Sequence, residues 1–126
     1  FSVPSGYERY LDTVLSLQEQ MNPMAHLKRF ELVKGNAQKT VPAYFRKHPE
    51  TIVSLAIFDF DIFAPTKAAL QQIKPCLSKG SILVFDELCD EYFPGETLAL
   101  KQVLGLRNVN IQRLPQTSRL SFIEIL

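Results

Sequence analysis

The chain lacks the features that would direct it to a membrane, a nucleic acid or the cell exterior. No apolar run approaches the roughly 18 residues of a membrane span, and no signal peptide is recognisable. The net charge is only +1, so neither nucleic acid nor an anionic membrane is an expected partner. The 2 cysteines have no metal-type spacing and are expected to be reduced thiols. A cytoplasmic protein is therefore predicted.

The sequence also lacks an initiator methionine. It opens at Phe1 and already reads as the middle of a fold, so we expect a fragment or a processed product. A length of 126 residues leaves room for a single domain, expected over residues 1–126. Hydrophobic residues make up 46% and charged residues 21%, the proportions of a globular chain that can form a core.

What the sequence does contain is an alternation of predicted helices and strands. Ser5 and Glu8 fit a capping box, which opens a helix over residues 5–22. The core is expected over residues 30–126. Its predicted elements are, in order, a strand at 30–34, a short helix capped by Thr40, a strand at 52–58, a helix from about residue 66, a strand at 81–85, a helix at 95–104, and strands at 109–113 and 120–126.

The strand pattern predicts an α/β fold with a mostly parallel sheet. Residues 52–58, Ile-Val-Ser-Leu-Ala-Ile-Phe, form a near-continuous apolar run, which is typical of a parallel strand covered on both faces. Right-handed crossovers would then place helices on both sides of the sheet. The last two strands are joined by too few residues for a parallel crossover, so they are expected to be antiparallel.

Acidic side chains follow both of the predicted central strands. The first strand ends at Asp59 and Asp61, and the second ends at Asp86 and Glu87. Ligands of open parallel sheets bind beyond the carboxyl ends of the strands, and neighbouring strands lie about 4.8 Å apart. The carboxylates would crowd one edge, with no Lys or Arg inside either motif to offset them. Mg²⁺, or else Mn²⁺, is the expected counter-charge, and ordinary solvated loop acids are the alternative.

Several short motifs succeed one another between residues 57 and 105. They are Asp59-Phe60-Asp61-Ile62-Phe63, Pro65-Thr66-Lys67, Leu77-Ser78-Lys79-Gly80, Asp86-Glu87 and Phe93-Pro94-Gly95-Glu96. In this order they resemble the macrocin O-methyltransferase family, whose members are SAM-dependent class I methyltransferases acting on sugar and related hydroxyls of natural products. Upstream, residues 33–36 and 40–42 resemble the third strand of that fold and the turn after it.

The resemblance implies a role for each acidic residue of the motifs. Asp59, Asp86 and Glu87 would hold Mg²⁺. Asp61 would be the general base that takes the proton from the acceptor hydroxyl, which metal coordination makes more acidic. The sequence departs from the family pattern twice, with Glu87 where Asp is usual and Phe63 where Tyr is common.

The same resemblance indicates what the chain does not contain. A class I methyltransferase binds SAM mostly through a glycine-rich turn after its first strand, whereas this chain has 5 glycines and no Gly-x-Gly. The fold would therefore be a partial Rossmann-like one whose first two strands are missing. Gly35, Asn36 and Ala37 would lie near the adenine of SAM, and the helix over 5–22 would be lid-like. The chain alone is expected to be inactive and to bind SAM poorly.

Missing strands would also leave an open sheet edge. In the class I strand order, 3-2-1-4-5-7-6, the strand at 52–58 would lose its neighbour. An apolar strand with a free edge favours pairing. We therefore expect either the strand at 30–34 or a second copy of the chain to pair with that edge, the latter giving a homodimer.

Three other functions fit parts of the pattern. Asp59-Phe60-Asp61 after an apolar strand resembles the nucleophile motif of haloacid-dehalogenase-like phosphoryl-transfer enzymes, although Ile62-Phe63 departs from the Gly-Thr or Gly-Val expected there. A nucleotide-sugar transferase also uses an Asp-x-Asp motif, which binds Mn²⁺ and a diphosphate. A non-enzymatic interaction module is the third alternative.

Overall fold

A computed structural model describes residues 4–107, 109–117 and 119–126. The chain divides into two compact units, Phe1–Gly35 and Asn36–Leu126. Residues 30–34, which were predicted to open the core, thus fall in the first unit. The prediction of one domain over residues 1–126 stays a prediction.

The first unit is built on helix α1 (Tyr7–Gln20). The predicted capping box at Ser5 is wrong, because Gly6 is the N-cap residue and no side chain of the described residues caps the helix. Gly6 has a φ of 86°, which glycine adopts without the steric cost that a Cβ would add. Glu8 forms an ion pair with Lys34 instead of reaching back to the helix start. No residue of α1 is fully buried.

Residues 30–34 form no strand, so this prediction is wrong. A strand is stable only where its backbone N–H and C=O groups find partners on a neighbouring strand. This segment belongs to the first unit, which contains no strand in its described part. The expected pairing of residues 30–34 with the edge of the sheet is therefore wrong as well.

The second unit contains a four-stranded sheet in the order β1-β2-β4-β3. Its strands are β1 (Val53–Phe58), β2 (Leu77–Phe85), β3 (Ile111–Arg113) and β4 (Ser121–Glu124). Strands β1 and β2 are parallel, whereas β4 is antiparallel to both β2 and β3. This arrangement confirms the predicted antiparallel end of the sheet. It also matches the 4-5-7-6 part of the class I strand order, as an α/β fold with a partial Rossmann-like sheet requires.

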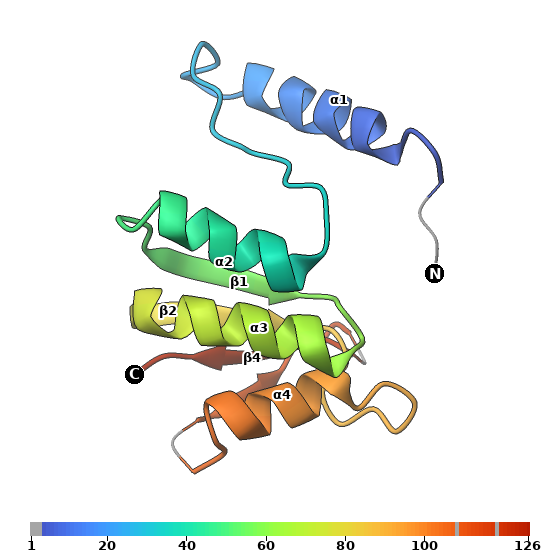
Figure 1. The fold of residues 1–126 in the computed structure, drawn as a ribbon, viewed down its shortest axis with the longest axis vertical. Coiled ribbons are helices and arrows are strands. Elements are labelled where there is room, and N and C mark those ends of the chain that lie inside the picture. The colour runs from blue at the N-terminus through green and yellow to red at the C-terminus, as the bar shows by residue number, and fades with distance from the viewer. Residues whose placement is uncertain (1–3, 108, 118) are drawn as a thin grey trace. The chain divides into compact units, whose positions relative to one another are not determined.

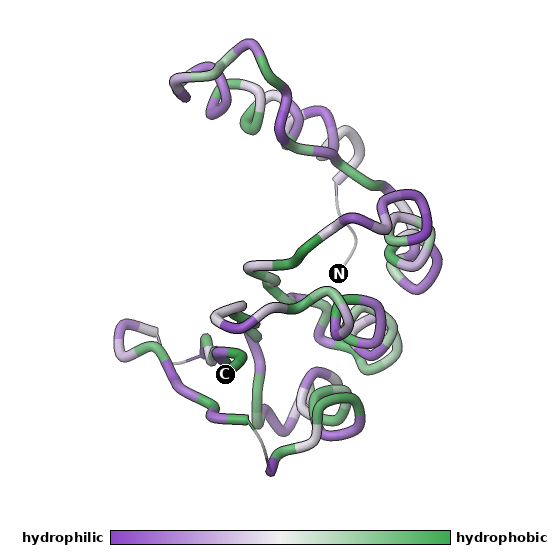
Figure 2. The backbone as a smooth tube through the Cα atoms, turned by 90° about the vertical axis from the view of Figure 1, so that its left-hand side faces the viewer, coloured by the Kyte–Doolittle hydropathy of each residue, from purple (hydrophilic) through white to green (hydrophobic). Residues whose placement is uncertain are grey.

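Helices α2 (Ala37–Lys47), α3 (Phe63–Ile73) and α4 (Gly95–Val103) form one layer on one face of this sheet (Figure 1). The side view in Figure 2 shows the three helices on one side of the strands. The predicted covering of both faces is therefore wrong for the described residues. Right-handed crossovers that advance in one direction keep their helices on one face of the sheet, and the helices move to the other face only where the strand order reverses.

Two helix starts differ from the predictions. Asn36, rather than Thr40, caps α2, since its side-chain oxygen accepts a hydrogen bond from the Gln38 N–H at 2.9 Å. Helix α3 begins at Phe63, before the predicted start at Thr66. None of the helices in the described ranges is long and apolar enough to cross a membrane.

The two faces of the sheet differ in what covers them. Phe58 and Phe85 lie in the core under the helices, and their rings stack with centroids 4.8 Å apart. Side chains of a strand alternate between faces, and Leu55, Ile57 and Ile82 are 56%, 66% and 37% exposed. The uncovered face is therefore apolar. Within the described residues β1 also has no partner on its outer edge.

Candidate acidic site at the carboxyl ends of strands β1 and β2

The two acidic motifs lie at the same end of two adjacent strands. Phe58 is in register with Phe85, so the residues that follow them, Asp59 and Asp86, occupy equivalent positions. The Asp86 N–H donates a hydrogen bond to the Phe58 carbonyl at 3.2 Å, which holds the strand ends together. The predicted convergence of the acidic residues at one edge of the sheet is confirmed at the level of the backbone.

Asp61 lies at the centre of a tight turn between β1 and α3. The Ile62 N–H donates to the Phe60 carbonyl at 2.6 Å, which closes a γ-turn around Asp61. Asp61 has a φ of 61°, a left-handed value that costs a non-glycine residue about 1–3 kcal/mol. Such strain persists only where the surroundings impose it, and here the first residues of α4 are those surroundings.

Gly95 packs directly against the turn that contains Asp61. A Cβ at this position would lie 2.4 Å from the Asp61 carbonyl oxygen and 2.5 Å from the backbone of Ile62 and Phe63. These neighbours are main-chain atoms, which cannot move aside as the end of a side chain can. Only glycine lets helix α4 begin this close to the turn.

Glu96 is a fully buried carboxylate that contacts both acidic turns. Its Oε1 accepts a hydrogen bond from the Phe60 N–H at 3.1 Å. Its Oε2 accepts a second one from the Glu87 N–H at 3.3 Å. Burial raises the pKa of Glu96, the two backbone N–H donors oppose that rise, and the charges of Asp59 and Asp86 add to it.

Glu87 and Asp61 form a second pair of interacting carboxyl groups. Glu87 is only 6% exposed, and burial raises the pKa of its side chain. The charge of the Asp61 carboxyl raises that pKa further, whereas the charge of Arg119 lowers it. Arg119 Nη1 lies 3.4 Å from Glu87 Oε1, whereas Glu87 Oε2 is buried and has no hydrogen-bond partner among the described residues.

The arrangement decides what kind of metal ion the acids could hold. Among the described residues, no three His, Cys, Asp or Glu side chains are grouped closely enough to enclose a metal ion. Mg²⁺ does not need such a cage, because it usually keeps several waters and binds through one or two carboxylates. The unpartnered Glu87 oxygen and the crowded carboxyls fit an ion of that kind. They do not fit a metal held by protein ligands alone.

The structure gives less information about the three residues expected near SAM than about the acidic residues. Asn36 and Ala37 form the start of α2, and the Asn36 side-chain oxygen is engaged in capping the helix. Gly35 has a φ of 142°, which favours glycine. A role of these three residues in binding SAM stays a prediction.

Sequence reasoning missed two residues of the site. Arg119 comes from the segment before β4 and was missed because no local pattern marks it. The register of β2 with β4, in which Phe85 faces Ser121, brings Arg119 opposite Glu87. Glu96 was visible in the Pro-Gly-Glu motif but was interpreted only as part of a helix start.

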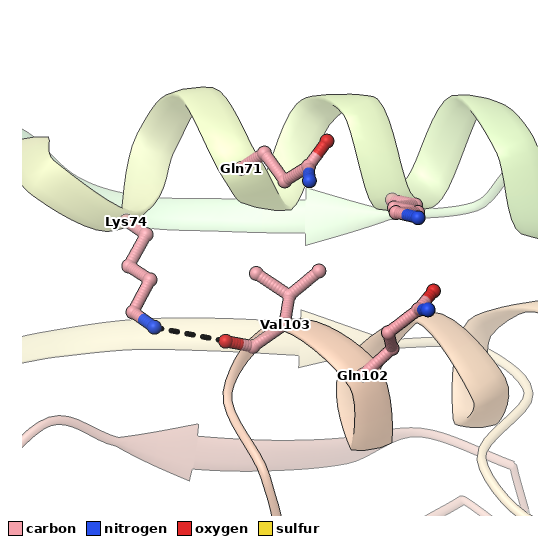
Figure 3. Close-up of a pocket in the computed structure, with 5 residues that line it drawn as sticks. Gln71, Lys74, Gln102 and Val103 are labelled. Atoms are coloured by element: carbon pink, nitrogen blue, oxygen red, sulfur yellow. Dashed lines mark hydrogen bonds between the residues drawn. The ribbon is translucent and has the colours of Figure 1, made fainter.

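Two pockets of the second unit have different chemical character. A small one of about 130 Å³ adjoins the acidic site and is lined by Asp86, Glu87, Leu88, Cys89, Asp90, Arg113 and Arg119. The other lies between α3 and α4 and is lined by Lys67, Gln71, Lys74, Gln102 and Val103. There the Lys74 Nζ donates to the Val103 carbonyl at 2.9 Å (Figure 3). A cation at the end of α4 stabilises the last turn, so this contact is structural.

Comparison with known proteins agrees with the fold and the motifs. No family model and no curated protein matches the sequence. Among solved structures, however, the fold is that of part of a methyltransferase, so the predicted resemblance to such enzymes is confirmed. Two of the similar structures are of CalS11, a calicheamicin methyltransferase described as a TDP-rhamnose 3′-O-methyltransferase of calicheamicin biosynthesis.

The similarity extends over nearly the whole chain. One CalS11 structure is 41% identical with a TM-score of 0.91, covering 97% of this chain and 48% of CalS11. The other is 42% identical with a TM-score of 0.92, covering 98% of this chain and 54% of CalS11. The chain thus spans about half the length of the CalS11 chains that it matches. Both neighbours are methyltransferases, which favours this class over phosphoryl transfer or nucleotide-sugar transfer.

Proposed function

We propose that this chain is part of a SAM-dependent O-methyltransferase that transfers a methyl group to a hydroxyl of a sugar or a related small molecule. The observation that carries the proposal is the acidic site at the ends of β1 and β2, on a fold shared with a sugar O-methyltransferase. A cytoplasmic location is part of the same proposal, since SAM-dependent modification of small molecules needs no membrane.

The acidic residues would divide the chemistry between them. One or two of Asp59, Asp86 and Glu87 would bind Mg²⁺ directly and the others through its retained waters, and the ion would supply a lowered pKa of the acceptor hydroxyl. Asp61 would accept the hydroxyl proton as the oxygen forms its bond to the methyl carbon and the bond from carbon to the SAM sulfur breaks. The effect of Asp61 on the pKa of Glu87 supports this division, because the base for a metal-bound hydroxyl must lie close to the metal ligands. Positioning of the two reactants then governs the rate.

The chain alone would not suffice for this reaction. Leu55, Ile57 and Ile82 leave an apolar sheet face exposed, and the sequence contains no Gly-x-Gly, the turn that a class I methyltransferase uses to bind SAM. The proposal is that SAM binding needs additional chain, with Gly35, Asn36 and Ala37 lying near the adenine. The alternative partner for the free β1 edge is a second copy of this chain.

The test is methyl transfer by the full-length protein that contains this chain. TDP-rhamnose is the acceptor to try first, with labelled SAM and with either Mg²⁺ or a chelator. We expect label in the sugar only with a divalent cation. Asp61→Asn should lower kcat by about 10²–10⁴-fold, the usual contribution of a general base. Exposed Glu91 provides the matched control as Glu91→Gln, which should leave the rate unchanged.

Two results would contradict the proposal. Methyl transfer at the same rate in chelator would exclude the metal role of Asp59, Asp86 and Glu87. Cleavage of TDP-rhamnose without SAM would instead favour the nucleotide-sugar transferase reading of the Asp-x-Asp motif. Binding of SAM by the full-length protein but not by the 126-residue chain, measured by calorimetry, is expected if the missing chain is needed.

A further inference from the structure

The buried carboxylate of Glu96 has no part in the chemistry described above. A buried charge is costly unless hydrogen bonds satisfy it, so a glutamate at a 0% exposed position needs a reason. Its two oxygens accept hydrogen bonds from different turns, Phe60 on one side and Glu87 on the other. These donors lie beyond the last paired residues of β1 and β2, where the ladder of the sheet no longer holds the backbone.

Gly95, the residue before Glu96, contacts the turn of Asp61 as well, through its own backbone. Gly95 rests against the carbonyl of Asp61 and the main chain of the next two residues, at distances that only glycine allows. The Asp61 conformation is strained, and its turn is therefore expected to relax unless something holds it. Gly95 and Glu96 together contact this turn on both sides of Asp61.

We propose that Glu96 is a positioning residue, which fixes the turn of Asp61 and the turn of Glu87 relative to each other through its two backbone hydrogen bonds. Helix α4 thereby holds in place the two turns that carry the acidic residues. The inference rests on the proposed function for its catalytic meaning. The pair of hydrogen bonds from the Phe60 and Glu87 amides to Glu96, called the clamp below, does not depend on a bound metal ion.

The first measurement uses the unmodified full-length protein in chelator. Hydrogen exchange, followed residue by residue by NMR, should show the amides of Phe60 and Glu87 exchanging at least about tenfold more slowly than the exposed amide of Glu91, as hydrogen bonds to a carboxylate predict. Equal exchange rates would show that no clamp exists. This outcome does not depend on any variant or on metal binding.

Two variants distinguish the effect of the position of the Glu96 carboxylate from the effect of its charge. Glu96→Gln keeps the length of the side chain but offers one oxygen, so at least one of the two amides should lose its protection. Glu96→Asp keeps the charge but is shorter by one methylene and should fail to reach both turns. Mn²⁺ affinity, measured by EPR of the free ion, should fall about tenfold or more in both variants, since one hydrogen bond to a charged group is lost. Glu91→Gln should bind Mn²⁺ as the unmodified protein does.

The outcomes distinguish this inference from the proposed function. Recovery of Mn²⁺ affinity in Glu96→Asp would mean that only the charge matters and would overturn the positioning role. Failure of the unmodified protein to bind Mn²⁺, with the amides of Phe60 and Glu87 still protected, would overturn the metal site and leave the clamp in place. If neither variant folds, the exchange rates of the unmodified protein still decide whether the clamp exists.

Discussion

Replacing Gly95 by alanine tests how closely helix α4 must approach the turn of Asp61. The added Cβ would lie 2.4 Å from the Asp61 carbonyl oxygen, whereas ordinary contact begins near 3.4 Å. The helix or the turn must therefore move by about 1 Å. Overpacking of this kind costs about 1–3 kcal/mol, and the better helix propensity of alanine returns less than about 1 kcal/mol. We expect the free energy of unfolding to fall by about 1–2 kcal/mol.

The assay is urea unfolding of the full-length protein and the variant, followed by circular dichroism. Gly80→Ala is the matched control. Gly80 has open space around it and a φ of 85°, so alanine there meets backbone strain of about 1–2 kcal/mol without a clash. Mn²⁺ binding distinguishes the two variants, because only Gly95→Ala should weaken it as well as lowering stability. A Gly95→Ala protein as stable as the unmodified one, with unchanged Mn²⁺ affinity, would refute the close approach.

Three further predictions concern the core, a helix start and the first unit. Phe58→Ala should lower the free energy of unfolding by about 3–5 kcal/mol in denaturant titration, because Phe58 is 2% exposed; a loss below 1 kcal/mol would mean that it is not core. Thr66→Val should cost about 0.5–1.5 kcal/mol, since it removes the 2.8 Å hydrogen bond from Thr66 Oγ1 to the Ile62 carbonyl; no loss of stability would exclude that bond. Lys34 holds the pKa of Glu8 below its ordinary value of 4.5, so the ion pair stabilises the first unit above about pH 4.5 and is lost as pH falls through the lowered pKa. In an NMR titration, Lys34→Gln should raise the Glu8 midpoint, and an unchanged midpoint would contradict the pairing.

The local pattern of the sequence predicted most of the second unit. The apolar runs of β1 and β2, the helix after each of them and the antiparallel end of the sheet are all found. The acidic residues also lie where the strand ends predicted them. These features follow from short-range rules, because the period of apolar residues and the turn chemistry of Gly and Pro act within a few residues.

The same local rules were insufficient where a segment needs a distant partner. Residues 30–34 have the composition of a strand, but a strand forms only where it pairs with another strand, and these residues adopt no strand. The apolar residues of β1 indicate two covered faces, yet the described helices cover only one. Local composition shows that a surface is suited to burial, but it does not show what buries it.

The sequence by itself determined the class of the fold, the order of its elements and the presence of carboxylates after two neighbouring strands. Only the tertiary structure decided which groups surround those carboxylates. Arg119 reaches Glu87 through the pairing of β2 with β4, and Glu96 reaches two turns because α4 packs against them. The physical reason is that charges and hydrogen bonds act over a few ångströms in space, and residues far apart in the chain come within that distance only when the sheet and its helices assemble.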